Sequence, residues 1–202
     1  MLVRRLLGVL PPQHLIALAW RLYPRREFLI CRDRRLIRGQ VRRQIGALAG
    51  ALQALGIRPG DRVATLLPAC PEAVYALFLP WQLGNVEVPL NPLLGEDELR
   101  HCLADSGARA VITMCQWCGR DNAALLARLR PRLPALQYVV LCDGKPAREG
   151  ELALHRLLAR PLPMRRAPIS PREIGRLSYT SGATGLPKGV AHTHEAYWRL
   201  AH

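Results

Sequence analysis

The chain has 202 residues, half of them apolar and 22% charged, an ordinary balance for a folded globular protein that excludes wholesale disorder. Its 29 Lys and Arg against 15 Asp and Glu give a formal net charge of +14, which raises nucleic-acid binding as a rival function class. The basic residues are nearly all Arg and are scattered along the chain, without a helix-turn-helix, zinc-finger or RNA-binding aromatic motif. We therefore expect no nucleic-acid partner.

The sequence offers no segment that would span a membrane. The longest apolar stretch, residues 63–94, is interrupted by prolines and glutamates, whereas a spanning helix needs ~20 uninterrupted apolar residues. The apolar run at residues 6–10 is shorter than the core of a secretory signal. Residues 14–23 predict a core helix, with an interfacial helix as the alternative, so peripheral membrane contact stays open. We expect a cytoplasmic protein.

Apolar segments of strand length alternate with segments of helical periodicity from residue 27 to residue 142. The predicted strands cover residues 27–32, 36–37, 63–67, 86–89, 108–113 and 137–142. The predicted helices cover residues 41–55, 71–83 (kinked near Pro80), 96–104 and 122–130. Continuous apolar strands are typical of strands buried on both faces of a sheet. The alternation predicts an α/β fold with a mostly parallel sheet flanked by helices, which binds ligands at the carboxyl ends of its strands.

The composition changes after residue 142. Residues 143–173 are rich in Pro and Arg and predict a connecting region with one short helix near residues 151–159. We expect three parts: an amino-terminal α/β subdomain at residues 1–142, the connecting region at 143–173, and the start of a next subdomain at 174–202. Thr193 is expected to cap a helix through residue 200, so the last part would stop within an element.

Two of the six cysteines, Cys115 and Cys118, have a suggestive spacing. A structural zinc site usually takes two such pairs, or one pair with closely spaced histidines, and neither is present. We expect no metal and dispensable free thiols. A thioredoxin-like redox pair at a strand-to-helix junction is the alternative.

The most informative segment is residues 177–190, where an apolar strand leads into residues 180–188, which hold three hydroxyl residues, two glycines and a single lysine. Glycines let backbone N–H groups converge on an anion, hydroxyls add donors, and a lysine adds a compact positive charge. This combination predicts a triphosphate-binding loop; a surface loop without a ligand is the alternative. The candidate phosphate-binding residues are Thr180, Ser181, Gly182, Ala183, Thr184, Gly185 and Lys188.

The loop differs from the NTPase P-loop, G-x-x-x-x-G-K-(S/T), whose lysine begins a helix. Here two residues separate Gly185 from Lys188, and Pro187 disfavours helix in the residue before it. We therefore expect residues 181–188 to form an exposed loop between two strands.

Residues 179–190 closely resemble the phosphate-loop signature of the adenylate-forming superfamily, which includes acyl-CoA synthetases, peptide-synthetase adenylation domains and luciferases. Eleven of twelve positions agree with Y-T-S-G-(S/T)-T-G-x-P-K-G-V. Ala183 departs, because the family carries a hydroxyl residue there. The resemblance extends to residues 56–64 and 83–108, and Asn91-Pro92 is more like acyl-CoA synthetases than peptide-synthetase domains.

This resemblance implies a ligase in which a carboxylic acid attacks the α-phosphate of ATP, with Mg²⁺ on the phosphates, and a thiol such as coenzyme A takes the acyl group. Residues 180–185 and Lys188 would hold the β- and γ-phosphates. The family's adenine-, ribose- and metal-associated residues and its catalytic lysine have no counterpart here, so we expect no catalytic residue and an amino-terminal fragment inactive alone. The alternatives are a non-catalytic remnant and a basic nucleic-acid-binding protein.

Overall fold

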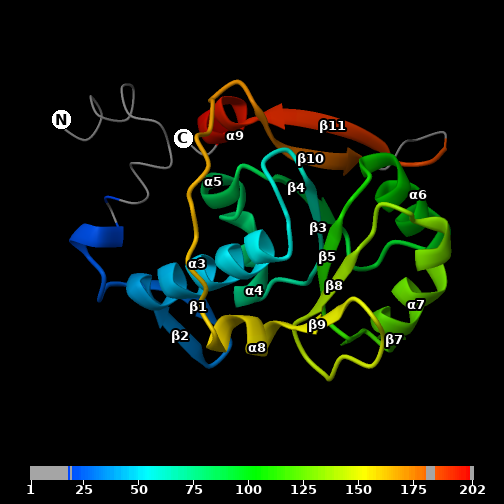
Figure 1. Cartoon of the computed structure of the whole chain (residues 1–202), viewed down its shortest axis with the longest axis horizontal. Coiled ribbons are helices and arrows are strands. Elements are labelled where there is room, and N and C mark those ends of the chain that lie inside the picture. Colours follow the sequence, from blue (N-terminus) through cyan, green and yellow to red (C-terminus); the bar gives the residue numbers. More distant parts are fainter. Residues whose placement is uncertain (1–17, 19, 181–184, 201–202) are drawn as a thin grey trace.

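A computed structural model describes residues 18, 20–180 and 185–200. Its main feature is a seven-stranded sheet with the order β11-β10-β4-β3-β5-β8-β9 (Figure 1). The strands are β3 (Arg62–Leu66), β4 (Val86–Leu90), β5 (Ala110–Thr113), β8 (Tyr138–Leu141), β9 (Glu151–Ala153), β10 (Ile174–Thr180) and β11 (Lys188–Thr193). All neighbouring pairs are parallel except β10 with β11. The predicted α/β fold with a mostly parallel sheet is confirmed.

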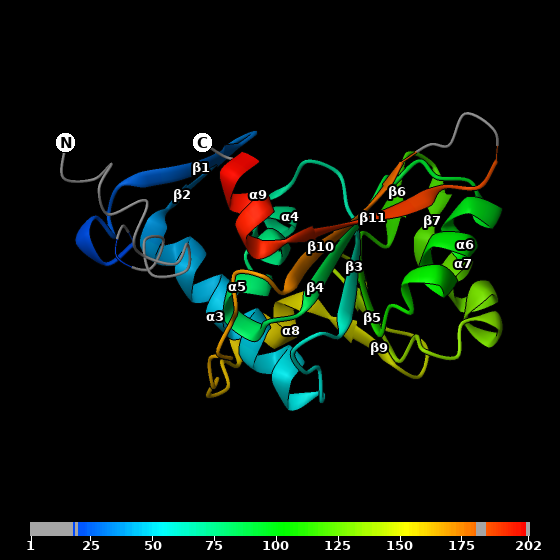
Figure 2. The same ribbon diagram turned by 90° about the horizontal axis from the view of Figure 1, so that it is seen from above.

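Helices cover both faces of this sheet (Figures 1 and 2). One face packs against α3 (Arg38–Ala54), α4 (Pro71–Leu77), α5 (Pro80–Leu83) and α8 (Leu154–Ala159). The opposite face packs against α6 (Glu96–Ser106) and α7 (Asn122–Leu129), which runs into the short 3-10 helix η1 (Arg130–Arg132). The last helix, α9 (His194–Leu200), follows β11 and lies beside α5, where Tyr197 stacks on Trp81 with ring centroids 5.8 Å apart.

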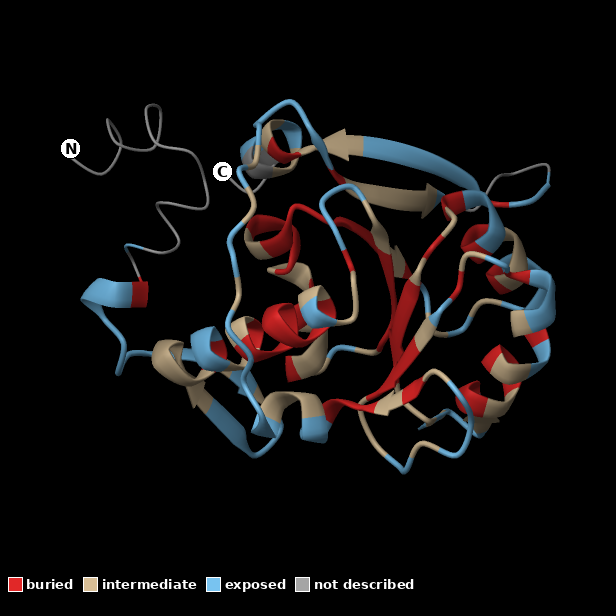
Figure 3. Ribbon diagram, viewed as in Figure 1, coloured by how far each residue is buried: buried red, intermediate tan, exposed pale blue. Residues whose placement is uncertain are grey.

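The central strands are apolar on both sides because each side faces a layer of helices. Val63 and Ile112 belong to the core cluster under α3 and α4. Ala64, which follows Val63, and Val111, which precedes Ile112, belong to the cluster under α6 and α7. Successive side chains leave a strand on opposite faces, so a sheet covered twice needs a continuous apolar run. The buried residues accordingly fill the middle of the molecule in Figure 3.

Two small hairpins lie outside this sheet. The first pairs β1 (Glu27–Cys31) with β2 (Arg34–Ile37), so the predicted second strand starts two residues earlier than expected. The second pairs β6 (Gln116–Trp117) with β7 (Arg120–Asp121) and was not predicted. Cys118 and Gly119 form its turn with φ of 48° and 76°, the left-handed conformation that two-residue hairpin turns require. Cys118 lies in the turn of this hairpin and Cys115 directly precedes it, so the pair lies in the connection between β5 and α7, and the thioredoxin-like alternative stays untested.

Two predicted helices needed correction. The helix expected at residues 71–83 is divided into α4 and α5, because Pro80 cannot donate a helical hydrogen bond and instead opens a new helix. The helix expected from residue 151 starts only at Leu154, since Glu151–Ala153 pairs with β8 as strand β9. The predicted cap of α9 is confirmed by the Ala196 amide, which donates to Thr193 Oγ1 over 3.1 Å.

The Pro- and Arg-rich segment after α8 lies along α3. The Gln53 side chain accepts from the Arg165 amide (2.8 Å) and donates to the Arg165 carbonyl (2.9 Å). The chain then enters the main sheet through β10, whose Arg176 pairs in register with Glu87 of β4. Residues 174–193 thus extend the same sheet as the earlier strands, and the division into three parts stays a prediction.

Most of the helix expected at residues 14–23 lies outside the described residues. Trp20 is described and is buried, with its ring 5.5 Å from that of Phe28 and 5.0 Å from that of Phe78. These contacts connect Trp20 to β1 and to the residue that follows α4. Among the helices that the structure describes, none is both long and apolar enough to cross a bilayer.

Candidate phosphate-binding site

The candidate site lies at the end of the β10–β11 hairpin. Because β10 runs parallel to β4, its carboxyl end lies at the same edge of the sheet as the carboxyl ends of β4, β3 and β5. Thr180 ends β10 and pairs in register with Lys188, which begins β11. The connection between them therefore projects from the edge at which parallel α/β sheets bind ligands.

The structure describes three of the seven predicted phosphate-binding residues. Thr180, Gly185 and Lys188 are all exposed, and Thr180 Oγ1 lies 3.5 Å from the Lys188 carbonyl. Residues 181–184, which include Ala183, lie outside the described residues. Lys188 is in a strand and not in the first turn of a helix, and it forms no ion pair with any described residue. The predicted exposed connection between two strands is confirmed for its described part, except that Lys188 itself belongs to β11 and Pro187 is buried.

Helix α6 fixes the base of this hairpin through two side chains. The Tyr179 hydroxyl donates to Asp105 Oδ2 over 2.5 Å, and His101 Nε2 donates to the Pro187 carbonyl over 2.9 Å. Burial, together with the hydrogen bond to Asp105, raises the pKa of Tyr179, so the phenol stays protonated and remains a donor. Figure 1 shows β10 ending beside α6. Both strands of the hairpin are thus held just before the loop begins.

Gly189 lets β11 lie close over β10. A Cβ atom at this position would lie 3.2 Å from Leu177 Cδ1 and 3.4 Å from the Tyr179 ring. Leu177 and Tyr179 themselves pack against the core cluster under α6 and α7. The glycine after the lysine therefore has a packing role besides any contact with a ligand.

The opposite face of β10 carries a partly buried polar cluster around Arg176. Its guanidinium contacts Glu87 Oε2 at 3.2 Å, the Tyr197 hydroxyl at 2.9 Å and Ser178 Oγ at 3.2 Å. It also lies 4.9 Å from the centroid of the Tyr197 ring, within range of a cation–π interaction. Burial raises the pKa of Glu87, and the charge of Arg176 opposes that shift. Arg176 thus connects β4, β10 and α9 on the side of the sheet away from α6.

Sequence reasoning assigned no role to these supporting residues. His101 and Asp105 fall in the segment that resembles the adenylate-forming superfamily, and their spacing of four puts them on one face of a helix. Glu87 and Arg176 are charged residues within otherwise apolar strands. A charged residue in a buried strand usually has a partner of opposite charge. The sequence could therefore have indicated that Glu87 and Arg176 form an ion pair.

Cys115 and Cys118 lie just before α7 in the chain, outside the β10–β11 hairpin. Cys118 is exposed and Cys115 is partly buried, and burial raises the pKa of the Cys115 thiol. In the part of the chain that the structure describes, no three His, Cys, Asp or Glu side chains gather as metal ligands would. That neither cysteine binds a metal stays a prediction.

Together, the fold and the hairpin define an α/β protein with a glycine-rich, lysine-bearing loop at the carboxyl edge of its sheet. A model of the AMP-binding enzyme family matches residues 17–202. The chain belongs to this family, which confirms the resemblance seen in residues 179–190.

Two of the relatives that the chain resembles are acid ligases by name. The chain is 38% identical to a feruloyl-CoA synthase of Amycolatopsis over 155 residues, which are 77% of this chain and 28% of that protein. It is 33% identical to the fatty acid–(acyl-carrier-protein) ligase ScoC of Streptomyces coeruleorubidus, over 85% of this chain and 31% of that protein. The chain therefore spans less than a third of these relatives.

Solved structures of ligases share the fold. The anthranilate CoA ligase AuaEII, in complex with anthranoyl-AMP, superposes with a TM-score of 0.80 at 28% identity, over 91% of this chain and 34% of that one. The amino-terminal domain of FACL13 from Mycobacterium tuberculosis superposes with a TM-score of 0.77, also at 28% identity, over 91% of this chain and 44% of that one.

Proposed function

We propose that this chain supplies the phosphate-binding part of an ATP-dependent ligase that joins a carboxylic acid to a thiol through an acyl-adenylate. The observation that carries the proposal is the placement of Thr180 opposite Lys188, at the carboxyl edge of a parallel sheet and on either side of a glycine-rich connection. The feruloyl, fatty acid and anthranilate ligases among its relatives support the same reaction class.

In this proposal the loop binds the β- and γ-phosphates of ATP. The Thr180 hydroxyl and the backbone N–H groups of residues 181–185 donate hydrogen bonds, and the Lys188 ammonium neutralises charge. Ala183 has no hydroxyl and contributes only its backbone. Mg²⁺ would arrive bound to the phosphates, where it reduces their charge further.

The reaction would proceed in two steps. A carboxylate oxygen forms a bond to the α-phosphorus while the bond to the bridging oxygen breaks, which yields acyl-adenylate and pyrophosphate. The sulfur of coenzyme A then attacks the acyl carbonyl, AMP leaves and the thiol proton is released. Residues 180–188 would act in the first step by stabilising the negative charge that gathers on pyrophosphate. A carrier-protein thiol is the alternative acceptor.

We further propose that the chain alone does not form acyl-adenylate at a useful rate. A few charge-assisted hydrogen bonds, each worth ~1.5–3 kcal/mol, must offset the ordering of a glycine-rich loop at ~1–2 kcal/mol per residue. Because these two contributions nearly cancel, we expect the chain alone to bind triphosphates only weakly and only with Mg²⁺. The competing proposal is a non-catalytic remnant that folds and binds a nucleotide or another protein.

Pyrophosphate exchange tests both parts of this proposal. The chain is incubated with ATP, Mg²⁺, labelled pyrophosphate and a panel of short, long and aromatic carboxylic acids. We expect no exchange from the chain alone and exchange from a longer protein that continues past residue 202. Robust exchange from the chain alone, abolished by Lys188→Ala, would contradict its inactivity. The absence of exchange from both would favour the remnant.

A further inference from the structure

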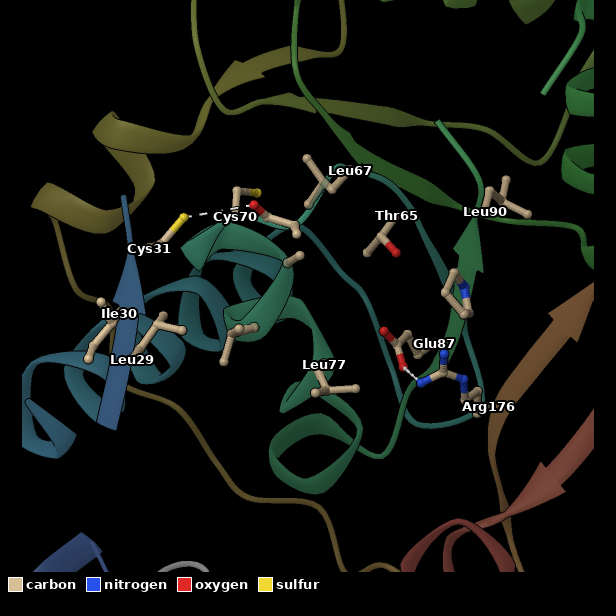
Figure 4. Close-up of a pocket in the computed structure, with 14 residues that line it drawn as sticks. Leu29, Ile30, Cys31, Thr65, Leu67, Cys70, Leu77, Glu87, Leu90 and Arg176 are labelled. Carbon is tan, nitrogen blue, oxygen red and sulfur yellow. Dashed lines mark hydrogen bonds and ion pairs between the residues drawn. The ribbon is translucent and has the colours of Figure 1, made fainter. Parts of the chain in front are cut away.

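A cavity of about 360 Å³ lies on the α4 side of the sheet (Figure 4). Its walls come from β1, from α4 and from the carboxyl-terminal halves of β3 and β4, and they are mostly apolar. Leu67 and Leu90 are buried in the wall formed by the sheet, and Val74 and Leu77 form the wall on α4. A volume of this size is typical of small-molecule sites.

The cavity has a polar floor. Thr65 and Glu87 are only 7% and 5% exposed, yet both line it. Glu87 pairs in register with Val63, and Thr65 lies two residues further along the same strand, so the two side chains leave the sheet on the same face. The hydroxyl group of Thr65 and the carboxylate of Glu87, both on buried residues, therefore face the same mostly apolar cavity.

Both groups keep unused hydrogen-bonding capacity. Oxygen Oε2 of Glu87 is bound by Arg176, and Figure 4 shows the other carboxylate oxygen pointing away from Arg176, toward the side where Thr65 lies. The Thr65 hydroxyl has no hydrogen-bond partner within the described parts of the chain. The two oxygens face the cavity and are not sealed from solvent, so an occupant that pairs with both would replace their hydrogen bonds to water with hydrogen bonds of its own.

The charge of the floor selects the kind of polar group that fits. Arg176 already compensates the carboxylate of Glu87, so the pair is close to neutral overall. A cationic amine or a second carboxylate would bring an uncompensated charge into an apolar cavity, at a high desolvation cost. A neutral hydroxyl can donate to Glu87 and accept from Thr65 without that cost.

We infer that this cavity binds a small apolar molecule that ends in a hydroxyl group, an alcohol or a phenol, with the hydroxyl on Thr65 and Glu87. The site is separate from the phosphate loop. Arg176 at the floor precedes Thr180 by four residues of strand, about 13 Å at the usual rise of ~3.3 Å per residue. The inference does not depend on the proposed ligase activity.

Four probes of one shape test the head group: 3-phenyl-1-propanol, 3-phenylpropylamine, 3-phenylpropanoate and the hydrocarbon butylbenzene. Binding is followed by ligand-observed NMR with the whole chain. We expect the alcohol to bind at least about tenfold more tightly than the amine or the carboxylate. Equal affinity for the alcohol and the hydrocarbon, or tightest binding of either charged probe, would overturn the inference.

Variants of the floor and the wall test the location. Thr65→Val keeps the shape but removes the hydroxyl, and should weaken binding of the alcohol about 2–12-fold, the value of one hydrogen bond, without changing that of the hydrocarbon. Thr65→Ser is the matched control and should restore binding. Val74→Trp should fill the cavity and abolish binding of both. Alcohol binding that survives Val74→Trp, or no saturable binding of any probe to the chain, would also overturn the inference.

Discussion

The centre of the sheet and its β10–β11 edge differ in what holds them. All four residues of β5 are buried, and they lie between two helical layers. The first four residues of β11 are exposed (Figure 3). Its hairpin is fixed to α6 by two polar contacts, Tyr179 with Asp105 and His101 with Pro187. The buried centre therefore provides stability, whereas the edge exposes Thr180 and Lys188, the residues on either side of the proposed phosphate loop.

A mutation in the centre of the sheet should strongly destabilise the protein. Ile112 is 0% exposed, and Ile112→Ala should lower the free energy of unfolding by ~2–5 kcal/mol through lost burial and a new cavity. Urea denaturation followed by circular dichroism measures this. Leu93→Ala is the control, because Leu93 is 67% exposed and should change stability by no more than ~0.5 kcal/mol. Similar losses in both would contradict the assignment of Ile112 to the buried centre of the sheet and of Leu93 to the exposed surface.

An added side chain should destabilise the protein more at the amino end of β10 than at the end that leads into the loop. A Cβ atom on Gly175 would lie 2.6 Å from the His194 ring, so Gly175→Ala should cost ~1–3 kcal/mol through overpacking. Gly46→Ala is the matched control within α3, where a Cβ meets no atom within 4 Å; alanine there should stabilise by ~0.5–1 kcal/mol. The two substitutions should shift the thermal midpoint in opposite directions. A shift of the same sign would show that β10 does not pack on α9 as described.

Removing one contact with α6 should loosen only the hairpin. Tyr179→Phe deletes the hydrogen bond to Asp105, worth ~0.5–1.5 kcal/mol. Amide hydrogen exchange should become faster in β10 and β11 and stay unchanged in β5. Tyr138→Phe, which removes a 3.0 Å hydrogen bond to the Leu55 carbonyl elsewhere in the sheet, should leave exchange in the hairpin unaltered. Equal effects of both variants on the hairpin would rule out α6 as its specific support.

The smallest expected effect concerns pH. Burial lowers the pKa of His194 in the folded protein, while Glu173 opposes the shift. The unfolded chain then binds more protons than the folded one, so stability falls as pH decreases below the unfolded value of ~6.5, by at most ~1.4 kcal/mol per pH unit. His194→Gln should flatten this slope between pH 7.5 and 5.5 in urea titrations. An unchanged slope would mean that other groups cause it.

The same contrast explains which features could be predicted from sequence. Strands β3, β5 and β8 are buried on both faces, and this produces a continuous apolar run that is visible in the sequence. The β6–β7 hairpin was missed because two-residue strands carry no periodic signal, and its turn depends on Cys118, a residue that rarely adopts positive φ. Strand β9 was missed because three residues beside a helix resemble its first turn.

At the site, the predictable part was local. The order of glycines, hydroxyls and lysine in residues 180–188 identified the loop, and Pro187 indicated that Lys188 lies outside a helix. The supports of the hairpin are separated from it by dozens of residues, as with His101 and Pro187, 86 residues apart. Such pairs depend on the topology of the sheet, which residue spacing alone does not determine.

The most direct test of the account is the binding of ATP by the chain and by two single-lysine variants. Lys145 and Lys188 are the only lysines and both are exposed, so Lys145→Ala removes the same charge at a distant place. Calorimetric titration should show weak, Mg²⁺-dependent binding of ATP, weaker binding of AMP, and loss of most ATP affinity in Lys188→Ala but not in Lys145→Ala. Equal affinities of the two variants for ATP, or equal affinity of the chain for ATP and AMP, would contradict a triphosphate site in the β10–β11 loop.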